Sequence, residues 1–270
     1  MTRVNPNNDF EINFMDTEKH GFSKCELLRR KHYINTTPPL NFNKLTELQK
    51  QRVRNEASRV FIKHEPTKWW NIFNCTKKIK SPERKIINLC IFEIINYISL
   101  YAHNIVHIFR ADNKDKDIQI YVEALSRNEK IDYKAIRPEK LCTILKLYIL
   151  NHLNGILSLD IASMLCSSFK KRSKLEYKAL MAYLPYALSE NESSLLIRMF
   201  NLFKIIDKNK EKTKMSIDSL LSLFSLVMFP KETFQAFDDL NIVKSIAQDI
   251  YCLDFNEIPF TMVPKIIKYI

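Results

Sequence analysis

Glycine scarcity is the feature that most restricts what this chain can fold into. Only Gly21 and Gly155 occur among its 270 residues. Gly-rich phosphate-binding loops, of both the Walker and the GxGxxG type, need residues without a Cβ where the backbone approaches a phosphate. The sequence therefore excludes them. Tight β-hairpin turns need positive φ angles, which glycine supplies best, so the same scarcity weighs against an all-β fold.

The hydrophobic pattern indicates a globular, all-α protein. Hydrophobic residues make up 46% of the chain and include 17 Phe, which is more than a disordered chain carries. Apolar positions recur at helical spacing over most of the sequence, and strand-like alternation is scarce. We therefore predict a helical bundle of about eight or nine helices.

Capping and breaking residues bound the predicted helices. Ser81-Pro82-Glu83 offers a serine cap and a proline at the first helical position, and a nearly continuous apolar run follows to Ile98. A helix that is apolar all round is buried inside a bundle. Another helix, amphipathic, runs from about Asn43 to His64, before Pro66. Further helices are expected over 117–127, from Pro138 to Leu153, and at about 158–171, 174–183, 191–207, 216–228 and 231–252.

The chain divides into two predicted regions. Residues 1–43 lack sustained periodicity and contain two turn-forming stretches, Asn5-Pro6-Asn7-Asn8 and Thr36-Thr37-Pro38-Pro39. We predict that residues 1–80 form a basic N-terminal extension with one helix, and that residues 81–270 form the helical domain.

The positive charge is concentrated in that extension. The net charge of the chain is +12, and residues 1–80 carry 16 Lys and Arg against 8 Asp and Glu. Such a region favours anionic lipid, nucleic acid or an acidic protein surface, unless it is simply a solvated, lysine-rich coat. Aromatic residues are not interleaved with the basic ones as in RNA-binding segments, which weighs against nucleic acid. An anionic membrane surface remains an open alternative.

Cysteine and histidine spacing gives no metal site. The six cysteines lie far apart without a CxxC pair, so we expect reduced thiols and no bound metal. His103 and His107 are four residues apart but have no carboxylate or thiol beside them. The stretch 86–109 carries too many polar side chains to span a bilayer, and no secretory signal is evident. We expect a cytoplasmic protein, with peripheral membrane attachment as the alternative.

Four stretches stand in a characteristic order along the chain. They are Ile108-Phe109-Arg110, the helix from Leu141 to Ile149 with Lys146 among apolar residues, Leu184-Pro185 before Asn191, and Thr213-Lys214-Met215-Ser216 before Ser219. In this order and at these intervals they resemble the Rho GTPase-activating (RhoGAP) domain. That family reads GIFR, then a SLLKLYLRELPEPL-like helix, then LPxxN, then NKMTxxNLAxxFxP. The resemblance covers about residues 82–235.

The resemblance implies a RhoGAP-like fold for residues 81–270 and a role for each matching residue. Arg110 matches the arginine finger that enters the active site of a Rho-family small GTPase. Lys146 matches the lysine that braces the finger, while Thr213 and Ser219 match positions that support it or face the partner. The GTPase would hold GTP and Mg²⁺, so the chain itself needs no cofactor and acts in trans.

Departures from the family pattern leave a second reading open. His107 replaces the glycine before the finger, Leu150 replaces a partner-facing arginine, and Ser219 replaces an asparagine. Counted from Lys146, the LPEPL turn falls on residues 152–156, without its prolines. The alternative is therefore a catalytically weakened or inactive scaffold that binds GTPases or other signalling proteins. Whether the chain counts as an enzyme stays open.

Arg110 and Lys146 each have a simpler interpretation that involves no role in catalysis or partner binding. An isolated arginine after a helix commonly contacts carbonyl groups or solvent, as Arg110 would. Lys146 has the alternative of a lysine whose aliphatic stem packs on the edge of the bundle while its ammonium reaches water. A third hypothesis, from another class, is a basic helical module that binds anionic lipid or nucleic acid through residues 1–80.

Overall fold

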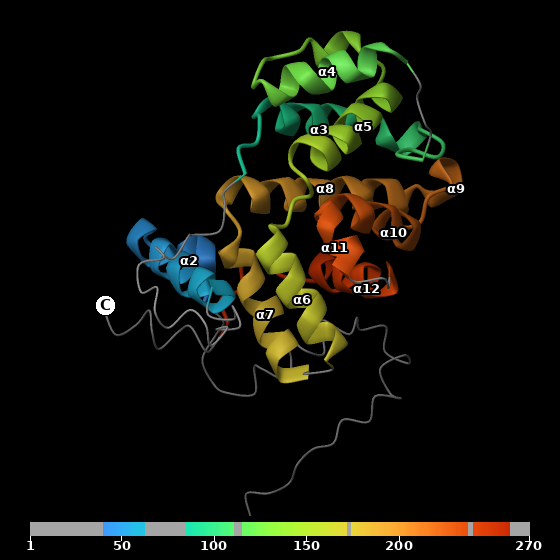
Figure 1. Ribbon diagram of the computed structural model, residues 1–270. Helices are drawn as coiled ribbons and strands as arrows, with labels where there is room; N and C mark the ends of the chain where they lie inside the picture. Colours follow the sequence, from blue (N-terminus) through green and yellow to red (C-terminus); the bar gives the residue numbers. More distant parts are fainter. Residues whose placement is uncertain (1–39, 63–84, 111–114, 172–173, 237–239, 260–270) are drawn as a thin grey trace, which may run out of the picture. The chain divides into compact units, whose positions relative to one another are not determined.

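The computed structural model describes residues 40–62, 85–110, 115–171, 174–236 and 240–259. The chain divides into two units, Met1–Pro39 and Leu40–Ile270, and every described residue belongs to the second. The all-α prediction is confirmed, because the described residues form 11 α-helices and no strand, apart from one isolated bridge (Figure 1).

The helices follow one another through short connections, several of them 3₁₀ turns. Their bounds are α2 (Glu47–Ile62), α3 (Cys90–Tyr101), α4 (Asp117–Ser126), α5 (Pro138–Leu147), α6 (Leu159–Lys170), α7 (Lys174–Ala187), α8 (Glu190–Lys208), α9 (Lys210–Thr213), α10 (Ile217–Met228), α11 (Lys231–Ala236) and α12 (Leu240–Tyr251). The 3₁₀ turns are η3 (Phe42–Lys44), η5 (Ala102–Asn104) and η6 (Tyr133–Ala135), and η7 (Tyr148–His152) is a π-helical turn.

The core is built around α3. Ile91, Ile94 and Ile98 of this helix are fully buried, and α3 packs against both α5 and α8. Figure 1 shows α3 and α5 beside each other above α8. Burying each of these side chains contributes roughly 1.5–3 kcal/mol. This agrees with the expectation of a helix buried inside the bundle.

The start of α3 differs from the prediction. We placed it at Pro82, which lies outside the described residues, but residues 85–88 are not helical and α3 begins at Cys90. Buried Asn88 accounts for the shift. Its Oδ1 accepts from the Cys90 N–H at 2.9 Å, its Nδ2 donates to the Leu125 carbonyl at 3.1 Å, and its own N–H donates to the Tyr148 hydroxyl at 3.0 Å. Asn88 thus lies just before α3 and supplies an acceptor for one of the N–H groups that the helix itself leaves without a partner.

A single helix was expected over residues 231–252. The described residues there form α11 and α12, and residues 237–239 between them lie outside the described residues. The four-residue α9 was not expected at all. It ends at Thr213, because the next residue, Lys214, has a left-handed φ of 55° that cannot continue a right-handed helix.

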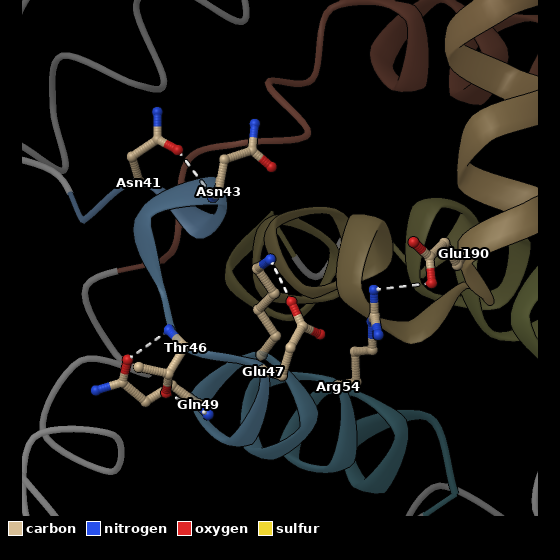
Figure 2. A network of polar contacts seen from close by, with 8 residues as sticks. Asn41, Asn43, Thr46, Glu47, Gln49, Arg54 and Glu190 are labelled. Atoms are coloured by element: carbon tan, nitrogen blue, oxygen red, sulfur yellow. Dashed lines mark hydrogen bonds and ion pairs between the residues drawn. The ribbon is translucent and has the colours of Figure 1, made fainter.

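The helix predicted within the N-terminal region, α2, belongs to the same unit as the bundle. It packs against α7 and buries Val53, Ala57 and Phe61, which lie four residues apart on one face. Figure 2 shows Arg54 of α2 reaching toward Glu190, at 3.7 Å, where α8 begins. The division of the chain near residue 80 stays a prediction, since residues 63–84, with the Trp69-Trp70 pair, lie outside the described residues.

Local capping sets the start of α2. The Thr46 N–H donates to Gln49 Oε1 at 2.9 Å, and the Gln49 N–H donates to Thr46 Oγ1 at 3.3 Å (Figure 2). This reciprocal pair is a capping box, which satisfies two N–H groups that the helix itself leaves free. Just before it, Phe42 N–H donates to the Asn256 carbonyl at 2.7 Å, which ties the beginning of the unit to the segment after α12.

Candidate functional site

The four residues His107–Arg110 form a tight turn, hereafter the arginine turn, directly after α3 and η5. The Arg110 N–H donates to the His107 carbonyl at 2.9 Å, which closes the turn. Ile108 and Phe109 are buried at 2% and 7% exposure, whereas Arg110 is exposed. The turn therefore anchors two apolar side chains in the core and leaves the arginine that follows them at the surface.

Two residues of the arginine turn have left-handed backbone angles. The φ angles are 53° at His107 and 66° at Phe109. This conformation costs a residue with a Cβ roughly 1–2 kcal/mol and is the one that glycine adopts freely. His107 stands where the family pattern has glycine, so the backbone shape that suits glycine is kept although the glycine is not.

Contacts with α8 and α9 hold this strained backbone in place. The Phe109 ring packs edge-on against Phe203 of α8, with ring centroids 6.1 Å apart. The His107 N–H donates to the Thr213 carbonyl, at the end of α9, at 2.8 Å. Strained residues persist where surrounding contacts over-determine them, and they cluster at functional sites.

Thr213, the last residue of α9, contacts both the arginine turn and the end of α8. Its side chain is fully buried, and its hydroxyl donates to the Ile206 carbonyl of α8 at 3.2 Å. The same hydroxyl accepts from the Met215 N–H at 3.4 Å. The Thr213 side chain thus holds the connection from α8 through α9 to α10. The backbone carbonyl of the same residue contacts the arginine turn.

An apolar hollow lies beside the arginine turn and joins it to α5 and α10. Phe109 and the half-buried Lys146 both line it. The other lining residues are Leu145, Ile149, Met199, Phe203, Leu220, Leu223, Phe224 and Val227. Lys146 therefore lines the same hollow as Phe109, the residue that directly precedes Arg110 in the sequence.

Ser219 lies in the first turn of α10, and its polar atoms are already engaged there. Its N–H donates to the Ser216 hydroxyl at 3.3 Å, and its own hydroxyl accepts from that of Ser216 at 3.2 Å. Ser216 is the cap of α10. Ser219 precedes Leu220 of the hollow, but its short side chain is half-buried and bonded within the cap.

The connection after α5 is shaped by Gly155. Its φ is 86°, and a Cβ placed on it would lie 2.6 Å from the backbone carbon of Phe229. No side chain fits that approach. The neighbouring Asn154 donates from Nδ2 to Glu232 Oε2 at 2.8 Å, and this hydrogen bond lowers the pKa of the Glu232 carboxyl.

Lys85 reinforces this connection from another part of the chain. Its ammonium donates to the carbonyls of Asn154 at 3.2 Å, Gly155 at 2.7 Å and Leu157 at 2.8 Å. The carbonyls of Asn154 and Gly155 belong to residues 152–156, where the family pattern has its LPEPL turn. The sequence alone gave no sign of this contact, because Lys85 is far from residues 154–157 along the chain.

Sequence reasoning also missed an ion cluster at the start of α4. Lys140 Nζ lies 3.3 Å from Asp115 Oδ2 and 3.1 Å from Asp117 Oδ2. The only available signal was a basic residue on one predicted helix and two acidic residues before another. Such a signal does not say which charges meet.

Neither a metal site nor a membrane-spanning helix is found in the described part of the chain. No group of three or more His, Cys, Asp and Glu side chains there could hold a metal ion. None of the helices described is both long and apolar enough to cross a bilayer.

Comparison with known proteins places these elements in a family. The sequence model of the RhoGAP domain matches residues 89–233, more than half of the chain. This range includes Arg110, Lys146, Thr213 and Ser219. An uncharacterized protein of Encephalitozoon cuniculi (strain GB-M1) is 21% identical over 173 residues, which cover 64% of this chain and 71% of that protein.

Proposed function

This chain belongs to the RhoGAP domain family, and from that premise we propose that it inserts Arg110 into the active site of a Rho-family small GTPase and accelerates GTP hydrolysis. A RhoGAP domain indicates a Rho GTPase-activating function and implies such a GTPase as the partner. The arginine turn is the observation that carries the finer proposal. It buries Ile108 and Phe109 and leaves Arg110 exposed at the matching motif position.

The chemistry of hydrolysis explains why an arginine suits this position. Negative charge builds on the phosphoryl oxygens in the transition state, inside a pocket from which water is largely excluded. A guanidinium stays protonated and presents several donors in a rigid fork. An arginine finger supplied in trans raises kcat by about 10³–10⁵-fold. The GTPase would hold GTP and Mg²⁺, and this chain would supply the guanidinium and its position.

The supporting residues fit roles around that guanidinium. Lys146 of α5 lines the same hollow as Phe109, and this supports a role in bracing the arginine turn. Thr213 supports the turn through its carbonyl. Ser219, at the first turn of α10, is proposed as a contact with the partner, although its hydroxyl is shared with the helix cap.

The decisive experiment measures phosphate release in single turnovers from a panel of GTP-loaded Rho-family GTPases. We expect the chain to stimulate at least one of them, and Arg110→Ala to remove about 10³-fold or more of that stimulation. Arg59→Ala is the matched control, because Arg59 is an exposed arginine on α2. Stimulation that survives Arg110→Ala would refute the finger.

One observation favours the second candidate, a scaffold that binds a GTPase without activating it. Ser219 offers one hydroxyl, bonded within its own helix cap, where the family pattern has an asparagine. The same assay separates the candidates when it is combined with a binding measurement. Binding of a GTP-loaded GTPase with no change in its hydrolysis rate would support the scaffold.

A further inference from the structure

Four exposed lysines follow one another from the last residue of α8 to the residue after α9. They are Lys208, Lys210, Lys212 and Lys214, hereafter the lysine cluster. Residues 204–214 contain five lysines against one aspartate and one glutamate. The aspartate, Asp207, is half-buried, and its Oδ1 accepts from the Ile217 N–H at 2.8 Å. This stretch is therefore an exposed surface with an excess of positive charge.

Within the described residues, no ion pair neutralises the lysine cluster. The salt bridges there all involve other cations, for example Lys140 beside Asp115. Glu211 is the only acidic residue inside the cluster, and it is exposed as well. Unpaired charges of one sign create a field that attracts a partner of the opposite sign.

The backbone that carries the cluster is bonded directly to the arginine turn. The carbonyl of Thr213 in α9 accepts from the His107 N–H at 2.8 Å. The Lys214 N–H donates to the Lys210 carbonyl at 2.8 Å, which closes α9 and fixes the backbone of three of the four lysines. Helix α9 also packs against η5, just before the arginine turn. The lysine cluster and the turn that exposes Arg110 are therefore adjacent.

A GTPase that receives Arg110 must also cover part of the surface around the arginine turn. A specific protein–protein interface involves about 20–30 residues on each side, far more than one inserted side chain. Since α9 is hydrogen-bonded to the turn, its exposed lysines are among the residues nearest to such a partner. Complementary charge at the edge of an interface mainly raises the association rate.

We propose that the lysine cluster binds an acidic surface of the GTPase next to its nucleotide site and speeds the association of the two proteins. This inference rests on the proposed function and adds a contact that is separate from the arginine finger. Arg110 would act on the chemical step and therefore on kcat. Because the lysines act on association, their loss should raise KM and leave kcat unchanged.

The first test neutralises three lysines together in the full chain, as Lys210→Gln/Lys212→Gln/Lys214→Gln. Glutamine removes the charge and keeps a similar helix propensity. With GTP-loaded GTPase as the varied substrate at about 0.05 M salt, we expect kcat/KM to fall by about 10-fold through KM. The difference from wild type should disappear at about 0.5 M salt, because salt screens exposed charges. An unchanged KM at low salt, or the same loss at both salt concentrations, would overturn the inference.

A second triple variant removes the same charge from another part of the molecule. Lys44, Lys170 and Lys171 are also exposed lysines, on η3 and at the end of α6. Figure 1 shows α6 well away from α9. Replacing these three by glutamine should leave KM within about twofold of wild type. An equal rise in KM in both triple variants would mean that net charge is responsible instead of the position of the lysines, and the inference would fall.

Glu211 allows a test in the opposite direction. Glu211→Gln removes the one negative charge inside the cluster. We expect kcat/KM at low salt to rise by about two- to threefold, since the attraction to an acidic partner increases. General damage to the fold would not produce a rise. A value equal to or below that of wild type would contradict electrostatic attraction by this surface.

An anionic membrane is the other partner that a basic surface could fit, and vesicles of phosphatidylcholine and phosphatidylserine test it. The triple variant at Lys210, Lys212 and Lys214 is compared with wild type for vesicle binding and for KM. A variant that loses vesicle binding and keeps the wild-type KM would show that the cluster recognises lipid, and would overturn the inference.

Binding measurements separate the failure of this inference from that of the proposed function. Stimulation by wild type with no effect of the triple variant would refute the lysine cluster alone. Binding of a GTP-loaded GTPase without stimulation would refute the arginine finger alone. In that case the dissociation constant replaces KM, and the triple variant should raise it by about 10-fold at low salt. A chain that neither binds nor stimulates any Rho-family GTPase would overturn both.

Discussion

The backbone N–H of His107 donates to the carbonyl of Thr213 at 2.8 Å, which joins two of the four motif stretches directly. One belongs to the arginine turn and the other ends α9. The first motif therefore depends on the last for its shape. This dependence leads first to predictions about the two residues joined by that hydrogen bond.

Removing the Thr213 hydroxyl should destabilise the protein. In Thr213→Val, the buried Met215 N–H loses its acceptor and the Ile206 carbonyl loses a donor. We expect the free energy of unfolding to fall by about 1–3 kcal/mol, measured by urea denaturation. Thr213→Ser keeps the hydroxyl and should lose less. If the serine variant were the less stable of the two, the hydroxyl would not be the stabilising group.

His107 should tolerate glycine better than a β-branched residue. At a φ of 53°, glycine removes strain but increases the entropy of the unfolded chain, so His107→Gly should change the free energy of unfolding by less than about 1 kcal/mol. His107→Val should destabilise by about 1–2 kcal/mol, because valine is disfavoured in the left-handed region. Chemical denaturation of the two variants would check this order, and a valine variant as stable as wild type would contradict it.

Gly155→Ala should be among the most damaging single-methyl additions to this chain. The new Cβ would lie 2.6 Å from a backbone carbon of Phe229 and 2.7 Å from the backbone nitrogen of Pro230, and neither can move as a flexible side chain would. Because these close contacts add to the strain of a φ of 86°, we expect the free energy of unfolding to fall by at least about 2 kcal/mol. Thermal unfolding of this variant beside wild type is the measurement. An unchanged melting temperature would show that the connection can move apart.

Buried thiols should resist alkylation across the neutral range. Burial raises the pKa of Cys166 to about 12, and it raises the pKa of Cys142 as well. Because the thiolate is the reactive form and exists only near or above the folded-state pKa, both residues should stay protonated at pH 8. Half-buried Cys252 should react first among the described cysteines. Mass spectrometry after iodoacetamide treatment of native protein tests this, and alkylation of Cys166 as fast as Cys252 would contradict it.

Removing residues 1–39 should affect neither the fold nor binding to an anionic membrane surface. These residues carry 6 Lys and Arg against 5 Asp and Glu, so most of the positive charge of residues 1–80 lies after them. The thermal stability of the Leu40–Ile270 unit and its binding to anionic vesicles, which should fall as salt rises, should both stay nearly unchanged. Removing residues 1–62 should destabilise the bundle, because it strips Val53, Ala57 and Phe61 from α7. Vesicle sedimentation and thermal unfolding give the two readouts. Salt-independent vesicle binding, or binding lost on removal of residues 1–39, would contradict the electrostatic role of the basic region.

Much of the helical pattern was readable from local signals. Pro138 marks the first residue of α5 and Ser158 caps α6, and both helices begin where these residues predict. Asp117 likewise begins α4 as expected. Prolines and capping residues act within one turn of the chain, so their effect is visible in sequence.

The sequence-based predictions fail where contacts between residues far apart in the chain determine the structure. Asn88 stops the helix predicted from Pro82 because its partners include Leu125 and Tyr148, which the sequence does not place beside it. The site shows the same division. Arg110 was proposed from its motif and stays a prediction, whereas the ion pairs of Lys140 were missed because they depend on how α4 packs against α5.

Lys85 has a consequence for the connection after α5. Where the family pattern has prolines, this chain gathers three carbonyl oxygens around one amine. A pyrrolidine ring restricts the backbone covalently, whereas the Lys85 ammonium does so only through its three hydrogen bonds. The order of this connection therefore depends on one charged side chain from a distant part of the sequence.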